Sequence, residues 1–226
     1  MVITATAPQL QYSRIASQPQ TAGASDRFES SASPQAFPTR AQLLSLTRPA
    51  ERLAPTLGDV QGPYYRPNAP VRSELFSAAE EGTRVSYRTQ VVDTDGHVIP
   101  GAMVDVWTAD KNGVYDMESS EFRGRARQQA DGEGKADFDA VRPGNYDLGV
   151  DPGTGQRLFR PAHVHVKVSA PGYQPLLSQL YFHDDPYNTV DPIIDREEGE
   201  RGYDPSLVMG TEGENVHTFK FVLAGA

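Results

Sequence analysis

Two histidines separated by one residue, His163 and His165, are the clearest sign of chemistry in this 226-residue chain. Around them, in residues 160–168, branched and polar residues alternate after a proline, which predicts a β-strand. Side chains of a strand alternate between its two faces, so both imidazoles should point one way and the intervening valines the other. Paired neutral imidazoles in a core or cleft are costly unless they bind something. They therefore indicate half of a metal site.

The other half of the site must come from nitrogen and oxygen, because the chain has no cysteine. No carboxylate follows the histidine pair within the next few residues to complete a common His/carboxylate pattern. His97, His183 and His217, each taken alone, are expected to be surface or satisfied core histidines. A copper or zinc site built with one of them as a third histidine stays an alternative.

Two tyrosines, Tyr115 and Tyr146, each follow a turn that contains glycine, at Gly113 and Gly144. A buried tyrosine is usually a core residue whose hydroxyl is hydrogen-bonded. Phenolate is nevertheless a hard, anionic oxygen ligand, and it suits Fe(III) far better than Zn(II) or Cu(I). If these two tyrosines join the histidine pair, the site would favour ferric iron.

Short strands separated by turns must position these residues, as 20 glycines and 18 prolines suggest. Residues 84–93 and 103–107 are expected to be paired neighbouring strands, since Asp95-Gly96 between them is a strong turn signal. Strands after these two are expected at 122–128, 135–138, 160–168, 176–182 and 216–223. The set predicts an all-β fold, a two-sheet β-sandwich, with residues 186–213 as a long loop or lid.

The expected domain organisation is a flexible leader at 1–38, a short helix or linker at 39–58, and one β-sandwich domain at 59–226. A net charge of −9 argues against nucleic acid or an anionic membrane surface as a partner. No apolar run is long enough to span a bilayer and no signal peptide is recognisable, so a cytoplasmic protein is expected. A homo-oligomer is possible, because edge strands of such sandwiches often pair.

Nine short motifs in this order resemble the successive signatures of the intradiol ring-cleavage dioxygenases, whose catalytic domain residues 59–226 would then form. They are GPYYRP at 62–67, DGHVIPGA at 95–102, VDVWTAD at 104–110, GVY at 113–115, FRGR at 122–125, VRPGNY at 141–146, RPAHVH at 160–165, SAPG at 169–172 and DPY at 185–187. The chain looks closer to the shorter, single-domain branch of the family, because it lacks the extended helical N-terminal segment of catechol-type members.

The resemblance implies a non-haem Fe(III) held by four residues, Tyr115, Tyr146, His163 and His165. By the same likeness Tyr146 and His165 would be axial ligands, and Tyr115 and His163 equatorial ligands beside a hydroxide. Tyr146 would also act in catalysis, by leaving the metal and taking a proton when a catechol binds. Arg160 matches the family arginine that faces the ring carbon to be attacked.

Further site residues follow from the same resemblance. Gln179 falls where the family often has a second polar group, and Val60 and Pro63 would line the substrate pocket. Ile193 or Ile194 would close that pocket from the long loop. The implied reaction inserts both atoms of O2 between the two hydroxyl-bearing carbons of a catechol, giving a cis,cis-muconate.

The choice of catechol is left open by the sequence. A carboxylated substrate needs a cationic partner, for which Arg66, Arg72 and Arg142 are candidates. A different class of function also stays open, since transthyretin-like sandwich domains share the Asp-Gly-x-x-Ile-Pro-Gly-Ala hairpin and a Pro-Gly-x-Tyr turn without catalysis. Such a binding module would not need the histidine pair together with Tyr115.

Overall fold

The computed structural model describes residues 51–191 and 204–226. The predicted leader at 1–38, most of the predicted helix or linker at 39–58, and Ile193 and Ile194 lie outside the described residues. Residues 51–58 are described and form no helix. In the described residues, no helix has the length and apolar character required to cross a membrane.

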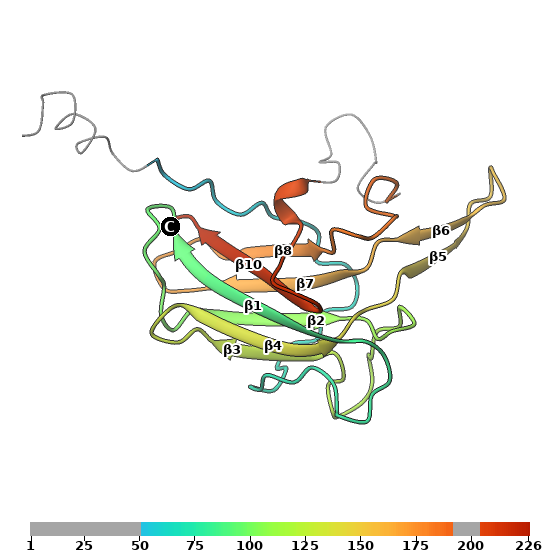
Figure 1. Ribbon diagram of the computed structural model, residues 1–226, viewed down its shortest axis with the longest axis horizontal. Helices are drawn as coiled ribbons and strands as arrows, with labels where there is room; N and C mark the ends of the chain where they lie inside the picture. Colours follow the sequence, from blue (N-terminus) through green and yellow to red (C-terminus); the bar gives the residue numbers. More distant parts are fainter. Residues whose placement is uncertain (1–50, 192–203) are drawn as a thin grey trace, which may run out of the picture. The chain divides into compact units, whose positions relative to one another are not determined.

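Two four-stranded sheets dominate the fold, in the orders β4-β1-β10-β9 and β3-β2-β7-β8 (Figure 1). The first sheet comprises β1 (Arg84–Asp93), β4 (Lys135–Val141), β9 (Gly210–Thr211) and β10 (Val216–Leu223). The second comprises β2 (Met103–Thr108), β3 (Arg125–Gln129), β7 (His163–Ser169) and β8 (Leu176–Tyr181). A two-stranded hairpin of β5 (Tyr146–Val150) and β6 (Arg157–Arg160) projects from one end, and a short 3-10 helix, η1 (Pro205–Leu207), precedes β9. The predicted all-β sandwich is confirmed.

The hydrophobic core lies between the two sheets and is built from alternate residues of each strand. Val85, Tyr87 and Val91 of β1 are buried there, as are Val104 and Val106 of β2. Strand β7 adds its three valines, all of which are at most 1% exposed. Fully burying one such side chain contributes about 1.5–3 kcal/mol. This alternation holds the inner face of β7 against the core and leaves its other face for the histidines.

The predicted pairing of the first two strands is wrong. Strand β1 pairs with β4 and β10, whereas β2 pairs with β3 and β7 in the other sheet. The turn at Gly96 does fold back on β1, through a bridge between Val92 and Val98 and a hydrogen bond from Ile99 N to Val91 O of 2.9 Å. The backbone then turns at Gly101, with φ of 77°, and enters the second sheet. Because hairpins and sheet-to-sheet crossings use the same turn residues, sequence did not distinguish them.

The segment 160–168 is also not one continuous strand. Arg160 ends β6, Pro161 and Ala162 are irregular, and β7 begins at His163. Proline has no N–H to donate to a sheet, so pairing stops at Pro161. Strand β6 pairs with β5, whereas β7 pairs with β2 and β8. Arg160 and the histidines are therefore carried by two different sheets.

Smaller differences concern strand ends. Strand β3 begins at Arg125 rather than Phe122, because Phe122 and Gly124 have φ of 53° and 70°, which a strand does not accept. Strand β4 runs on to Val141, and β8 ends at Tyr181. The part of 186–213 that is described contains η1 and β9.

Candidate metal centre

The predicted histidine pair lies on the outer face of the sheet β3-β2-β7-β8, away from the core. Adjacent strands align Arg125, Trp107, His165 and Gln179 in one row across this face. The indole of Trp107 stacks on the His165 ring, with centroids 4.9 Å apart and planes 3° apart. His163 and His165 are only 4% and 2% exposed, because loops and aromatic rings cover them. The site is thus a buried cluster built on the outer face of one sheet.

Three potential ligand atoms of this cluster converge. His163 Nε2 lies 3.1 Å from His165 Nε2 and 3.1 Å from the Tyr115 hydroxyl oxygen. Nitrogen ligands bound to one metal ion at about 2.0–2.1 Å would lie roughly 3 Å apart, so these separations suit a shared ion. His163 Nδ1 lies 2.7 Å from the carbonyl oxygen of Pro161 and can donate to it, which leaves the Nε2 lone pair for a metal.

The protonation states of these groups also fit a metal. Burial lowers the pKa of His163 to about 3 and the pKa of His165 well below its ordinary value, so both imidazoles stay neutral. Burial raises the pKa of Tyr115, so its phenolate needs a nearby cation. His165 Nδ1 is buried without a hydrogen-bond partner in the described part of the chain. Two neutral imidazoles and a phenol that ionises beside a cation are a suitable ligand set for a hard metal ion.

Two glycines bring the tyrosine-bearing turns together. A Cβ atom at Gly113 would lie 2.3 Å from the carbonyl oxygen of Asn145, and one at Gly144 would lie 2.4 Å from the carbonyl oxygen of Lys111. The two turns are also joined by a hydrogen bond of 2.9 Å from Gly144 N to Asp110 O. Only glycine permits so close a contact between two backbones. Tyr115 and Tyr146 therefore emerge side by side.

The structure adds Tyr64, which the sequence analysis did not assign to the site. Its ring stacks on Tyr115 with centroids 4.4 Å apart, and its hydroxyl hydrogen-bonds to that of Tyr146. Burial, together with this contact to Tyr146, raises the pKa of Tyr64 to about 12. The GPYYRP motif was the sequence feature that could have indicated Tyr64 as a site residue. Its Gly62 has φ of 66°, and a Cβ there would lie 3.6 Å from the His165 ring.

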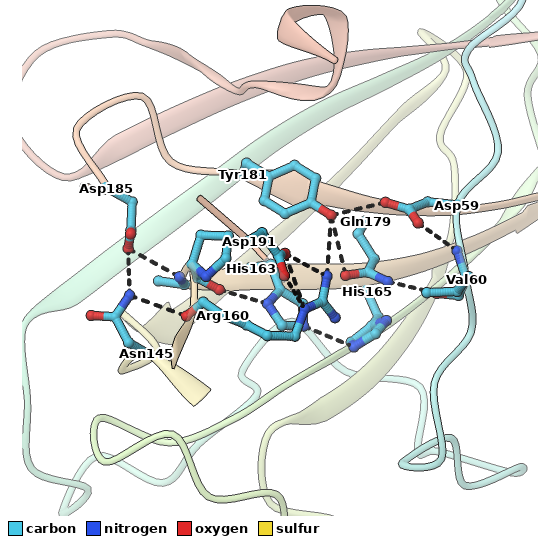
Figure 2. Close-up of polar contacts among 12 residues, drawn as sticks. Asp59, Val60, Asn145, Arg160, His163, His165, Gln179, Tyr181, Asp185 and Asp191 are labelled. Carbon is cyan, nitrogen blue, oxygen red and sulfur yellow. Dashed lines mark hydrogen bonds and ion pairs between the residues drawn. The ribbon is translucent and has the colours of Figure 1, made fainter. Parts of the chain in front are cut away.

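Tyr146 lies beside Tyr115, with ring centroids 6.2 Å apart. The described contact of its hydroxyl is to Tyr64 rather than to either histidine. Asn145, next to it in sequence, donates to Asp185 Oδ2 at 2.8 Å, and the same oxygen accepts from Ala162 N at 3.0 Å. Figure 2 shows this link between the turn at Asn145 and the break before β7.

Arg160 lies beside the histidines with its guanidinium buried (Figure 2). It forms an ion pair of 2.9 Å with Asp191. Gln179, fully buried, donates from Nε2 to the carbonyl oxygen of Val60 at 2.7 Å. This bond ties the segment before the GPYYRP motif to the sheet. The side chains of Val60 and Pro63 are exposed, so their role as pocket walls stays a prediction.

A cavity of about 1030 Å³ lies elsewhere, beside strands β1, β4 and β10 of the other sheet. The remaining histidines also lie away from His163 and His165. His97 and His183 are exposed, and His217 is buried on β10, where it packs against Phe182. In residues 51–191 and 204–226, none of these three contacts the histidine pair. The three-histidine copper or zinc alternative therefore lacks a ligand.

The fold and the site together define a β-sandwich protein with a buried histidine–tyrosine cluster on the outer face of one sheet. A family model described as dioxygenase (Dioxygenase_C) matches residues 60–225. The chain therefore belongs to this family, and the predicted membership of the intradiol ring-cleavage dioxygenases is confirmed.

Among curated relatives, a chlorocatechol 1,2-dioxygenase of Rhodococcus opacus is 34% identical over 58% of this chain and 58% of its own length. A catechol 1,2-dioxygenase of Candida albicans is 32% identical over 66% of this chain and 54% of its own length. The chain thus spans just over half the length of these relatives. The solved dioxygenase domain of a dioxygenase–carbohydrate-binding fusion from Streptomyces sp. SirexAA-E is 31% identical, with a TM-score of 0.63, covering 76% of this chain and all of that one.

Proposed function

We propose that this protein is a non-haem Fe(III) intradiol dioxygenase that cleaves a catechol between its two hydroxyl-bearing carbons. Both atoms of O2 would enter the product, a cis,cis-muconate. The observation that carries the proposal is that the Tyr115 hydroxyl oxygen and His165 Nε2 each lie 3.1 Å from His163 Nε2, beside Tyr146. A transthyretin-like binding module has no need of this cluster, and family membership supports the enzyme.

Tyr115, Tyr146, His163 and His165 would hold the ion, which supplies Lewis acidity and a template for the two catechol oxygens. Tyr64 keeps the Tyr146 hydroxyl within hydrogen-bonding reach, so the Tyr146 phenol has a partner when it takes a proton from the substrate. The buried guanidinium of Arg160 would stabilise negative charge that develops on the ring carbon under attack. Trp107, stacked on His165, helps to exclude water from this face of the sheet.

The proposed substrate is a catechol without a carboxylate. Each arginine considered as a carboxylate partner has other contacts. Arg66 lies 3.5 Å from Asp116, and Arg142 pairs with Asp184 at 2.6 Å. Arg72 Nη2 lies within hydrogen-bonding distance of three backbone carbonyl oxygens. The names of the relatives, catechol, chlorocatechol and hydroxyquinol 1,2-dioxygenases, agree with uncharged substituents.

The test is O2 uptake by the iron-loaded protein against catechol, chlorocatechols, hydroxyquinol and protocatechuate, with the ultraviolet spectrum of each product. We expect muconate spectra with the uncharged catechols and weak activity with protocatechuate. The protein should be red-brown from tyrosinate-to-iron charge transfer, and Tyr115→Phe should lose most of both colour and activity. A colourless protein that cannot be reconstituted with iron would refute the proposal. Full colour and activity in Tyr115→Phe would refute the ligand assignment alone.

A further inference from the structure

The guanidinium of Arg160 is held by residues that have no assigned role so far. Its Nε lies 3.2 and 3.1 Å from the two carboxylate oxygens of Asp191, and its Nη2 lies 2.9 Å from Asp191 Oδ2. The same Nη2 lies 3.5 Å from the hydroxyl oxygen of Tyr181. That hydroxyl donates to Asp59 Oδ2 at 2.8 Å. Figure 2 shows the whole chain of contacts, from Asp191 to Asp59.

The direction of each hydrogen bond follows from the chemistry of the groups. Arginine has no acceptor and a hydroxyl has one proton, so Arg160 donates to Tyr181, and Tyr181 donates to Asp59. Asp191 accepts from one edge of the guanidinium, formed by Nε and Nη2, in a two-point contact that fixes its plane. In the part of the chain that the structure describes, no residue accepts from Nη1. The contacts therefore orient the guanidinium and leave the Nη1 end for a ligand.

This ion pair is buried, and the positive charge of its guanidinium acts on the two histidines that are proposed metal ligands. The side chains of Arg160 and Asp191 are 6% and 0% exposed. Burial lowers the pKa values of His163 and His165, and the positive charge of Arg160 lowers both further. The guanidinium is thus within electrostatic reach of the proposed ligands. A long side chain with about 2 kcal/mol of rotamer entropy would not keep this place without partners.

We infer that Asp191 is the positioning residue for Arg160, and that Tyr181 with Asp59 provides a second, weaker hold on the same guanidinium. The inference rests on the proposed function, in which Arg160 faces the reacting ring carbon. An error of about 1 Å in such a group can cost roughly 100-fold in rate. Asp191 would act on the reaction through Arg160 and would touch neither substrate nor metal.

The first test is Asp191→Asn in the iron-loaded full chain, with Asp184→Asn as the matched control. Asp184 lies on the same loop, but its side chain is half-exposed and pairs with Arg142 rather than with Arg160. We expect Asp191→Asn to lower kcat for catechol about 100-fold, with little change in KM, iron content or visible absorption. Tyr181→Phe should lose less, about tenfold, and Asp184→Asn should behave like the wild type.

A second test asks whether Asp191 acts through Arg160. In an Arg160→Met background, Asp191→Asn should produce no further loss of kcat/KM. A loss that multiplies with that of Arg160→Met, or a fall in iron content and Tm that parallels the fall in activity, would show a structural role and overturn the inference.

A third measurement does not depend on catalysis. In the metal-free full chain, the 15N-labelled Arg160 Nε–H should give a separate NMR signal that is protected from exchange. Asp191→Asn should abolish that signal, and Asp184→Asn should keep it. Persistence of the signal in Asp191→Asn would overturn the inference even if the wild type cleaves no catechol, whereas an inactive wild type by itself refutes only the proposed function.

Discussion

The contact between the two tyrosine-bearing turns is tested most directly by Gly144→Ala. Neither Gly144 nor Gly132 has a positive φ, so alanine creates no backbone strain at either position. At Gly144 the new Cβ would lie 2.4 Å from the carbonyl oxygen of Lys111 and 2.8 Å from Gly113 N. Ordinary van der Waals contact begins at 3.4 Å, so the turns must separate by about 1 Å. Overpacking of this kind costs about 1–3 kcal/mol.

This separation should affect stability and metal binding together. In a domain of this size, a destabilisation of about 1–3 kcal/mol corresponds to a fall in Tm of roughly 2–12 °C, measured by thermal unfolding of the metal-free protein. Because Tyr146 would move away from Tyr115, we also expect lower iron content after reconstitution, weaker charge-transfer absorption and about 100-fold slower catechol cleavage. Gly132→Ala, which has no atom within 4 Å of the new Cβ, is the control and should change little. If the two variants have the same Tm and iron content, the explanation of how the tyrosines are positioned is wrong.

Three further predictions concern other contacts. Tyr64→Phe removes the hydrogen bond to Tyr146 but no proposed ligand. Iron content should therefore be retained, whereas catechol turnover, measured by stopped-flow absorption, should fall. Loss of iron would contradict this prediction. Arg72→Met removes a donor that lies within hydrogen-bonding distance of three backbone carbonyl oxygens, and it should cost about 1–3 kcal/mol in urea unfolding; unchanged stability would be the contrary result. Burial alone would raise the pKa of Asp93, but hydrogen bonds from Asp95 and His97 outweigh burial and lower this pKa in the folded protein. The ionised Asp93 therefore contributes to folding stability above its unfolded pKa of about 3.9, and this contribution is lost as pH falls through the lower folded pKa. The stability difference between wild type and Asp93→Asn should therefore shrink below about pH 4, and a difference that is constant with pH would contradict the assignment.

The sequence predicted best what depends on local pattern. The alternation in β7 predicted that His163 and His165 share one face, and the sequence showed that Tyr115 and Tyr146 each follow a turn that contains glycine. The structure agrees, and for the tyrosines it adds the reason, since each glycine is needed for contact with the other turn. Local signals succeed because side-chain alternation and turn geometry are set within a few residues.

The sequence failed where the outcome depends on distant residues. No pattern in residues 84–107 tells a hairpin from a crossing between sheets, because both need the same turn. Asp191 and Tyr181 contact Arg160 from 31 and 21 residues away, and a single sequence holds no signal for such pairing. Tyr64 was within reach of sequence reasoning, because GPYYRP is irregular and aromatic, but its partner at Tyr146 was not.

The alternation of side chains in β7 separates the substitutions that affect folding from those that affect the site. Its valines pack in the core and its histidines lie on the outer face, so neighbouring positions in this strand affect different properties of the protein. Substitutions at Val164, Val166 or Val168 should act on the folding equilibrium, and those at His163 or His165 on the proposed metal site. Residues 57–66 are absent from the hydrophobic core between the sheets, and Tyr64 and Tyr65 pack instead beside Trp107 and Tyr115. If the proposed function is correct, mutations there would change the substrate preference without requiring compensating changes in the core.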